Sequence, residues 1–262
     1  MKRLTKLVVL VAAVAIVAAA CGSDDSGGDL GEVSVAVENA YLPFNFIDEA
    51  SGDAIGFDYD IWAELCDVMG CTPVFVEAGW PAVIEETGQG LYDTAADGIT
   101  ITEDRKEVVD FSEPYMITVQ KYMVRLNEDR IGTAAELEAG VKAGDYRIGT
   151  QVGTTNYETA LARMGDDDSG IDAFDQFGVA VQALIAGDVD AVIIDDVAGQ
   201  GYQGANAGDI RLLPDVLSSD PLGFIFPQGS ELVATTNAAI VELRDNGKLE
   251  ELITKWFIDF EG

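Results

Sequence analysis

Short apolar runs alternate with longer amphipathic segments along most of the chain. Compact runs rich in β-branched residues are typical of buried strands, whereas apolar residues three or four positions apart predict a helix with one buried face. Strands are predicted at residues 33–37, 74–77, 94–96, 147–151, 191–194 and 210–213. Helices are predicted at residues 59–69, 157–164, 180–186 and 231–245. This alternation predicts an α/β fold with mixed, mainly parallel sheets.

The N-terminal segment departs from this pattern and has the features of an export signal. Lys2, Arg3 and Lys6 precede an uncharged apolar run at residues 7–20. That run is too short to cross a bilayer comfortably, and a basic start followed by such a run is typical of a secretory signal peptide. We therefore expect residues 1–20 to be a signal peptide.

Cys21 follows three alanines, and this junction resembles the lipobox of bacterial lipoproteins, in which the cysteine is diacylated and becomes the new N-terminus. Signal cleavage beside an incidental cysteine is the alternative. The GSDDSGGDLG segment that follows is polar and rich in glycine. Residues 21–31 are therefore expected to form a lipidated cysteine and a flexible tether. The folded part would lie outside the cytoplasm, in the periplasm or on the outer face, held to the cell membrane by lipid alone.

Cys66 and Cys71 lie where a predicted helix ends near Gly70 and a strand begins. Export would place both cysteines in an oxidising compartment, which favours a disulfide between them. Two small buried thiols are the alternative, because the spacing alone does not distinguish the two states.

The charge and the composition exclude several functions. The chain of 262 residues carries 47 acidic and 15 basic residues, a formal charge of -32, and no histidine. A nucleic-acid partner is excluded, because this field repels polyanions and each phosphate contact would need a lysine or an arginine. The missing histidine removes Ser-His-Asp and Cys-His catalysis and histidine-ligated zinc. The acidic segment 165–172 lacks the glycine at the sixth position of an EF-hand loop, so we expect a solvated turn there, and no metal or cofactor.

Eight segments of the chain match those of a known family in the same order. They are AYLPFNF (40–46), GFDYDIW (56–62), DGITITEDR (97–105), VDFSEPY (109–115), GTQVGTTN (149–156), AGDVDAVIID (186–195), LGFIFPQGS (222–230) and DNGKLEELITKWF (245–257). Through them the chain resembles the family 3 solute-binding proteins of bacterial amino-acid ABC transporters from about residue 33 to residue 257. The resemblance implies the two-lobed type II periplasmic-binding-protein fold, with two hinge crossings. It implies one lobe at 32–116 plus 222–262 and the other at 117–221.

The resemblance further implies that a free L-amino acid is captured as the lobes close and is delivered to an ABC transporter permease. We expect a monomer that is not an enzyme. The alternative is an exported dehydratase of the cyclohexadienyl type on the same scaffold, with Glu38 or Asp97 acting as a general acid or base.

A zwitterionic ligand needs fixed partners for both of its charges. Arg105 is the best partner for the carboxylate, because a guanidinium can hold both oxygens, and Thr102 is a plausible helix N-cap beside it. The loop containing Gly153 offers the amides of Thr154 and Thr155 to the same anion. The resemblance assigns the ammonium to Asp195, helped by the Gly98 carbonyl and the Thr100 hydroxyl.

The resemblance also indicates which residues contact the apolar surface and the side chain of the ligand. Tyr41 and Phe57 match the aromatic residues that enclose the ligand, and Trp80 is a weaker candidate. The family positions held here by Glu38, Asp97 and Gln151 lie toward the ligand side chain. Two of these three residues are acidic, so they favour arginine, lysine, ornithine or histidine, with a polar neutral ligand such as glutamine as the next choice.

Overall fold

A computed structural model of the chain describes residues 30–260. The predicted signal peptide, the lipidation site Cys21 and nearly all of the predicted tether lie outside the described residues. Among the described helices, none has the length and the apolar character needed to span a membrane.

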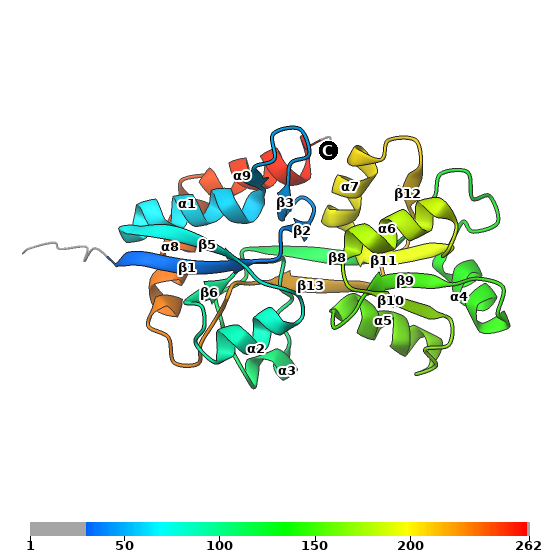
Figure 1. The fold of residues 1–262 in the computed structure, drawn as a ribbon, viewed down its shortest axis with the longest axis horizontal. Helices are drawn as coiled ribbons and strands as arrows, with labels where there is room; N and C mark the ends of the chain where they lie inside the picture. Colours follow the sequence, from blue (N-terminus) through cyan, green and yellow to red (C-terminus); the bar gives the residue numbers. More distant parts are fainter. Residues whose placement is uncertain (1–29, 261–262) are drawn as a thin grey trace, which may run out of the picture.

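In the first sheet, the N-terminal strand β1 (Gly31–Val37) lies between the edge strand β5 (Cys71–Glu77) and the central strand β6 (Thr94–Ala95) (Figure 1). Its order is β5, β1, β6, β14 (Ile225–Phe226) and β7 (Asp110–Phe111). Strand β1 is parallel to β5 and β6, whereas β14 is antiparallel to β6 and β7. The helices of this lobe are α1 (Phe57–Met69), α2 (Ala82–Gly88), α3 (Glu103–Lys106), α8 (Leu232–Asp245) and α9 (Lys248–Phe257). A small antiparallel sheet is formed by β2 (Ala40–Tyr41), β3 (Asn45–Ile47) and β4 (Ala54–Ile55).

The second sheet is built from the middle of the chain. Its order is β10 (Ile171–Phe174), β9 (Ile148–Gln151), β11 (Ala191–Asp195), β8 (Met116–Arg125) and β12 (Ile210–Leu212), and β13 (Ser218–Leu222) also pairs with β8. Helices α4 (Ala134–Ala143) and α5 (Thr155–Met164) lie on one side, and α6 (Phe177–Ala186) and α7 (Asp196–Ala205) lie on the other (Figure 1). Both sheets are mixed, and the predicted α/β class is confirmed.

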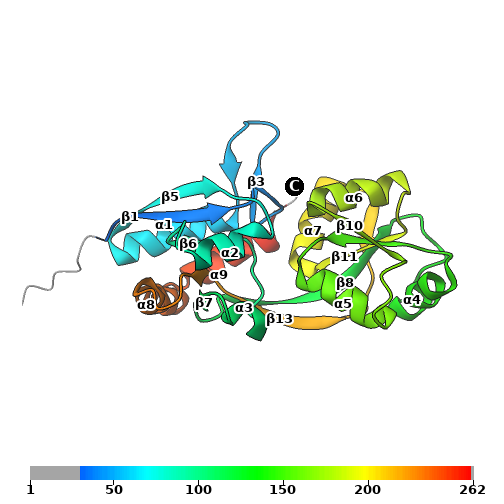
Figure 2. The same cartoon turned by 60° about the horizontal axis from the view of Figure 1, so that its bottom comes forward.

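Strands β8 and β13 connect the two lobes (Figure 2). They pair in antiparallel register from Met116 opposite Leu222 to Gln120 opposite Ser218. Two paired strands form a hinge that can twist while each sheet keeps its own core. This pairing supports our proposed division of the chain into a lobe of 32–116 plus 222–262 and a lobe of 117–221.

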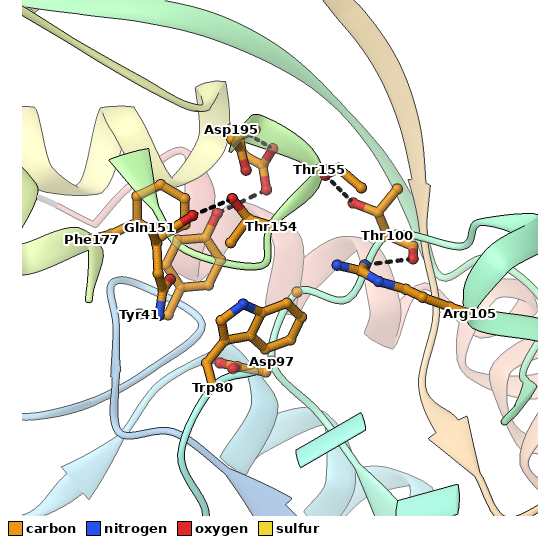
Figure 3. A pocket seen from close by; sticks show the side chains of 12 residues that line it. Tyr41, Trp80, Asp97, Thr100, Arg105, Gln151, Thr154, Thr155, Phe177 and Asp195 are labelled. Carbon is orange, nitrogen blue, oxygen red and sulfur yellow. Dashed lines mark hydrogen bonds between the residues drawn. The ribbon is translucent and has the colours of Figure 1, made fainter. Parts of the chain in front are cut away.

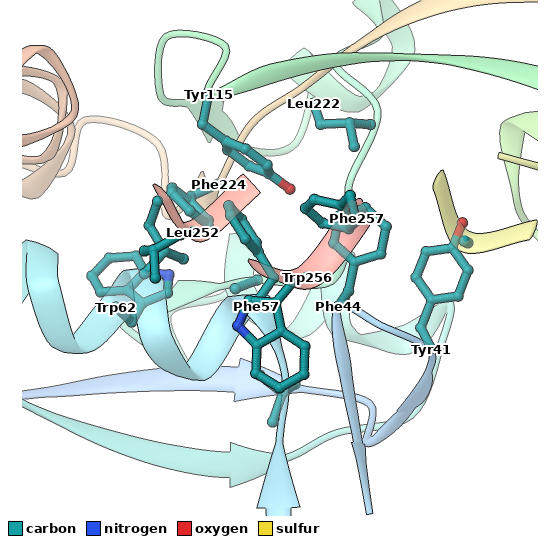
Figure 4. Close-up of a cluster of buried hydrophobic side chains, with 14 of the residues drawn as sticks. Tyr41, Phe44, Phe57, Trp62, Tyr115, Leu222, Phe224, Leu252, Trp256 and Phe257 are labelled. Carbon is teal, nitrogen blue, oxygen red and sulfur yellow. The ribbon is translucent and has the colours of Figure 1, made fainter. Parts of the chain in front are cut away.

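Helix α1 shows how the sequence produces the core of the first lobe. Phe57, Ile61 and Leu65 are spaced four residues apart, so they form one stripe, and all three are fully buried. Figure 4 shows Phe57 inside a cluster of aromatic rings, where it contacts Tyr115 and Phe257. This aromatic cluster is part of the core of the first lobe, which forms one side of the ligand pocket.

The end of α1 is covalently joined to the next strand. The chain leaves α1 through a glycine in the left-handed conformation, and a disulfide then links Cys66 to Cys71 at the start of β5. The predicted disulfide is therefore present in the structure.

Candidate functional site

One pocket lies between the two lobes, where loops that follow several strands meet (Figure 3). The first lobe contributes Tyr41, Trp80, Asp97, Gly98, Thr100 and Arg105. The second lobe contributes Gln151, Thr154, Thr155, Asn156, Phe177 and Asp195. Of the predicted ligand contacts, these sets contain all except Glu38, Phe57 and Thr102.

Arg105 provides the cation of the pocket. Thr102 caps α3 by accepting a hydrogen bond from the Arg105 backbone N–H at 3.2 Å, so it orients Arg105 although it does not line the pocket. The Arg105 Nη1 donates to the Thr100 carbonyl at 2.8 Å, and its guanidinium lies 5.1 Å from the centre of the Trp80 ring. None of the ion pairs between described residues involves Arg105. Burial lowers its pKa to about 10, so it stays charged at neutral pH.

The loop from β9 to α5 faces Arg105 from the second lobe. Gly153 has a φ of 72°, a left-handed conformation that favours glycine, and an added Cβ would lie 2.8 Å from Pro81 of the first lobe. Thr154 caps α5 by accepting from the Tyr157 N–H at 3.1 Å. Helix α5 therefore directs its first N–H groups, including that of Thr155, toward the pocket and makes its wall suitable for an anion.

Asp195 provides the acid of the second lobe, at the end of β11. It is 3% exposed and accepts hydrogen bonds from the Tyr41 hydroxyl at 2.8 Å and from Asn156 Nδ2 at 3.2 Å. Burial raises its pKa to about 6, while these two donors oppose the shift. Asp195 is therefore ionised at neutral pH and can face an ammonium group.

A second acidic region lies on the first lobe. Asp97 is 5% exposed and Glu38 is 8% exposed, yet neither forms an ion pair with a described residue. Gln151 crosses from the second lobe and donates to Glu38 Oε1 at 2.8 Å. Burial raises the pKa of Asp97 to about 7, and burial together with the charge of Asp97 raises that of Glu38 to about 8. A cation placed beside these two carboxyl groups would stabilise their ionised forms.

The structure places Tyr41 in the pocket and Phe57 outside it. Tyr41 lines the pocket and stacks on Phe177 of the second lobe, with ring centres 5.1 Å apart. Phe57 instead packs in the core, because its position on α1 places it on the same stripe as Ile61. Trp80, which we had ranked lower, lines the pocket.

Two lining residues were not identified from the sequence. Asn156 follows the GTT turn directly, and its place at the start of a predicted helix could have revealed it. Phe177 carries no such signal, because its role depends on the approach of α6 to Tyr41.

Several hydrogen bonds join the lobes across the pocket, so the structure has the closed arrangement. The Thr100 and Thr155 hydroxyls are 3.2 Å apart, and the Trp80 Nε1 donates to the Val152 carbonyl at 3.1 Å. Within residues 30–260, no group of three or more histidine, cysteine or carboxylate side chains is placed to hold a metal ion.

The chain is similar in sequence and in structure to known proteins. A profile of the bacterial extracellular solute-binding proteins, family 3, matches residues 33–259. The L-arginine-binding protein of Pseudomonas aeruginosa is 30% identical over 238 residues, which cover 86% of this chain and 87% of that protein. The L-cystine-binding protein TcyJ of Escherichia coli is 27% identical over 229 residues, covering 87% and 83%. The crystal structure of an ancestral amino acid-binding protein, a precursor of cyclohexadienyl dehydratase, has a TM-score of 0.78 and 30% identity, covering 87% of this chain and 96% of that chain.

Proposed function

The chain belongs to the bacterial extracellular solute-binding proteins of family 3, and on that basis we propose that it captures one free amino acid with a cationic side chain and delivers it to an ABC transporter permease. Its fold is the type II periplasmic-binding-protein fold. Proteins of this family act outside the cytoplasm. Arginine, lysine, ornithine and histidine are the candidate ligands.

The observation that carries this proposal is the placement of opposite charges on opposite sides of one pocket. Arg105 belongs to the first lobe and Asp195 to the second, and both line the pocket. An amino acid carries a carboxylate and an ammonium on one carbon, so it can engage both residues at once. The N-terminus of α5 adds hydrogen-bond donors for the carboxylate, and the Gly98 carbonyl and the Thr100 hydroxyl add acceptors for the ammonium. Ligand binding and lobe closure then become one event.

The cationic preference rests on the acids of the first lobe. Asp97 lines the pocket and Glu38 lies behind Gln151, so the side-chain end of the pocket has one carboxyl group in its wall and a second carboxyl group behind that wall. These carboxyl groups would repel an acidic ligand side chain. A neutral ligand side chain would leave Asp97 and Glu38 without a positively charged partner. The Tyr41 and Trp80 rings would cover the ligand's methylene groups.

Calorimetric titration of the ligand-stripped mature domain with the twenty amino acids, and with ornithine, tests this proposal. We expect the tightest binding from a cationic amino acid, with a dissociation constant near the micromolar range, about -8 kcal/mol. Asp97→Asn should weaken the cationic ligand by at least about tenfold while changing glutamine binding little. Tightest binding to glutamate would refute the cationic preference, and no binding of any amino acid would refute the function.

An exported dehydratase is the second candidate, because one structural neighbour is a precursor of cyclohexadienyl dehydratase. Glu38, with a pKa of about 8, could hold the proton that a general acid must donate at neutral pH. Incubation with a cyclohexadienyl acid distinguishes the two functions. An enzyme would protonate the leaving hydroxyl, release water and carbon dioxide, and form a new aromatic chromophore at a steady rate, whereas a binding protein would leave the ultraviolet spectrum unchanged.

We also propose that Cys21 is lipidated after removal of residues 1–20 and that the protein acts as a monomer tethered to the membrane. Cys21→Ala should move the protein from the membrane fraction to the soluble fraction without changing ligand affinity. Retention of this variant on the membrane would refute the lipid anchor, and sedimentation of the soluble form as a dimer would refute the monomer.

A further inference from the structure

A chain of buried polar side chains continues the pocket into the first lobe. It begins at Asp97, passes through Asn45 on β3 and ends at Asp58 on α1. Asn45 and Asp58 are fully buried and neither lines the pocket. The recognition of a cationic ligand side chain, as described above, does not use them.

Asn45 has a single orientation in this chain. Its Oδ1 accepts a hydrogen bond from the Asn39 backbone N–H at 2.6 Å. Its Nδ2 therefore carries the two donors, and it donates to Asp97 Oδ1 and to Asp58 Oδ2, each at 2.8 Å. A donated hydrogen bond stabilises an ionised carboxylate, so Asn45 both holds Asp97 in place and favours its charged form.

Asp58 is an acid without a compensating charge. Its Oδ1 is buried without a hydrogen-bond partner among the described residues. Burial, with a further contribution from Asp97, raises its pKa well above the ordinary value. Burial therefore favours the neutral, protonated form of Asp58, in which it adds no negative charge behind Asp97.

Several strands and helices around Asp97 carry a titratable group. They are the acids Glu38, after β1, and Asp58, on α1; the phenols Tyr41, on β2, Tyr115, before β8, and Tyr202, on α7; and the guanidinium of Arg105, on α3. Arg105 is the one basic group of this set, and the proposed function assigns it to the ligand carboxylate. The acids consequently lack a positive charge of their own at the side-chain end of the pocket.

We propose that Asn45 is a positioning residue for the cationic end of the ligand, and that capture of this cation by Asp97 and Glu38 releases a proton from these buried acids to the solvent. The inference rests on the proposed function. Before binding, one of the two buried acids keeps its proton, because a second buried negative charge nearby is unfavourable. The ligand's cation supplies the missing charge, both acids ionise, and the proton leaves. A neutral ligand brings no such charge and releases no proton.

Calorimetric titration of the wild-type mature domain in two buffers of different ionisation enthalpy measures the number of protons released when the ligand binds. With arginine at pH 7 we expect about one proton released per ligand, falling toward zero near pH 10, where both acids are already ionised. With glutamine we expect none. Arginine binding with identical heats in the two buffers would overturn this inference and leave the proposed function standing, whereas failure of every cationic amino acid to bind would overturn the function itself.

The positioning role is tested by the pH dependence of arginine affinity. Wild-type affinity should rise as pH increases, by up to about tenfold per pH unit while the acids are protonated, and should then level off. Asn45→Leu removes the hydrogen-bond donor to Asp97 and should raise the pKa of Asp97. The curve of arginine affinity against pH should therefore be displaced to higher pH for this variant, and at alkaline pH it should approach the wild-type affinity. A uniform loss of affinity at every pH would show a structural role only and would overturn the proposal for Asn45.

Asp58→Asn is the matched control, because its amide oxygen can still accept from Asn45 and the variant mimics a neutral Asp58. Its affinity curve should follow that of the wild type up to about pH 8. A displacement as large as that of Asn45→Leu would overturn the assignment of the effect to Asn45. The two-buffer measurement needs no variant, so the inference remains testable if Asn45→Leu fails to fold.

Discussion

Replacement of Arg105 by alanine is the most direct test of how this pocket holds a zwitterion. The guanidinium is the one cation among the pocket-lining residues, and no described carboxylate forms an ion pair with it. Removing one partner of a buried charge pair typically costs about 2–5 kcal/mol, because the remaining charge stays desolvated. We expect a loss of at least about 3 kcal/mol for Arg105→Ala, which corresponds to a dissociation constant more than about a hundredfold higher.

Isothermal titration of Arg105→Ala with the best wild-type ligand measures this loss. Arg147→Ala is the control, because it removes the same charge from an exposed residue that pairs with Asp172 on the second sheet, outside the pocket. The control should bind within about twofold of the wild type, since exposed ion pairs contribute about 0–1 kcal/mol to stability and this one does not touch the ligand. Without ligand, both variants should fold, which a thermal melt verifies. An affinity change below tenfold in Arg105→Ala would refute the assigned role.

Three further perturbations test closure, the disulfide and the buried acids. Gly153→Ala should weaken binding by about tenfold, because its Cβ would meet a proline across the cleft, whereas Gly144→Ala, with a similar positive φ and open space, should not; equal affinities would contradict this closure contact. Replacing Cys66 and Cys71 with serine should destabilise the protein by about 2 kcal/mol and lower the Tm by about 4–8 °C, and an unchanged melt would contradict this. The pKa of Glu38 is raised to about 8 in the folded protein, so protonated Glu38 favours the folded state at low pH. Chemical denaturation of the unliganded protein should therefore show the free energy of unfolding falling from about pH 5 to about pH 8. A rise over this range would contradict the shift.

The elements could be predicted because their signals are local. The stripe of Ile61 and Leu65 predicts α1, although the structure begins the helix at Phe57, two residues before the predicted start. The apolar run ending at Asp195 predicts β11, and the N-cap expected at Thr102 is present at the start of α3. Each of these signals depends on residues within a few positions of one another.

The place of an aromatic residue could be predicted from the sequence only where a local pattern records it. Phe57 and Tyr41 are both aromatic residues in matching segments, yet one packs in the core and the other lines the pocket. The stripe on α1 could have assigned Phe57 to the core. The role of Phe177 could not be predicted, because its contact with Tyr41 joins α6 of one lobe to β2 of the other.

The amino-acid sequence by itself determined the α/β class, the order of the six strands and four helices predicted from it, and the family, with its arginine and its acid as candidate poles. These follow from periodicity, from turn chemistry and from matching segments, which act over short stretches of chain. Only the tertiary structure decided that Asn45 joins Asp97 to a second buried acid and that Gln151 reaches Glu38 from the other lobe. These hydrogen bonds join residues 13, 52 and 113 positions apart, and they depend on how the sheets and helices pack, so no local pattern records them.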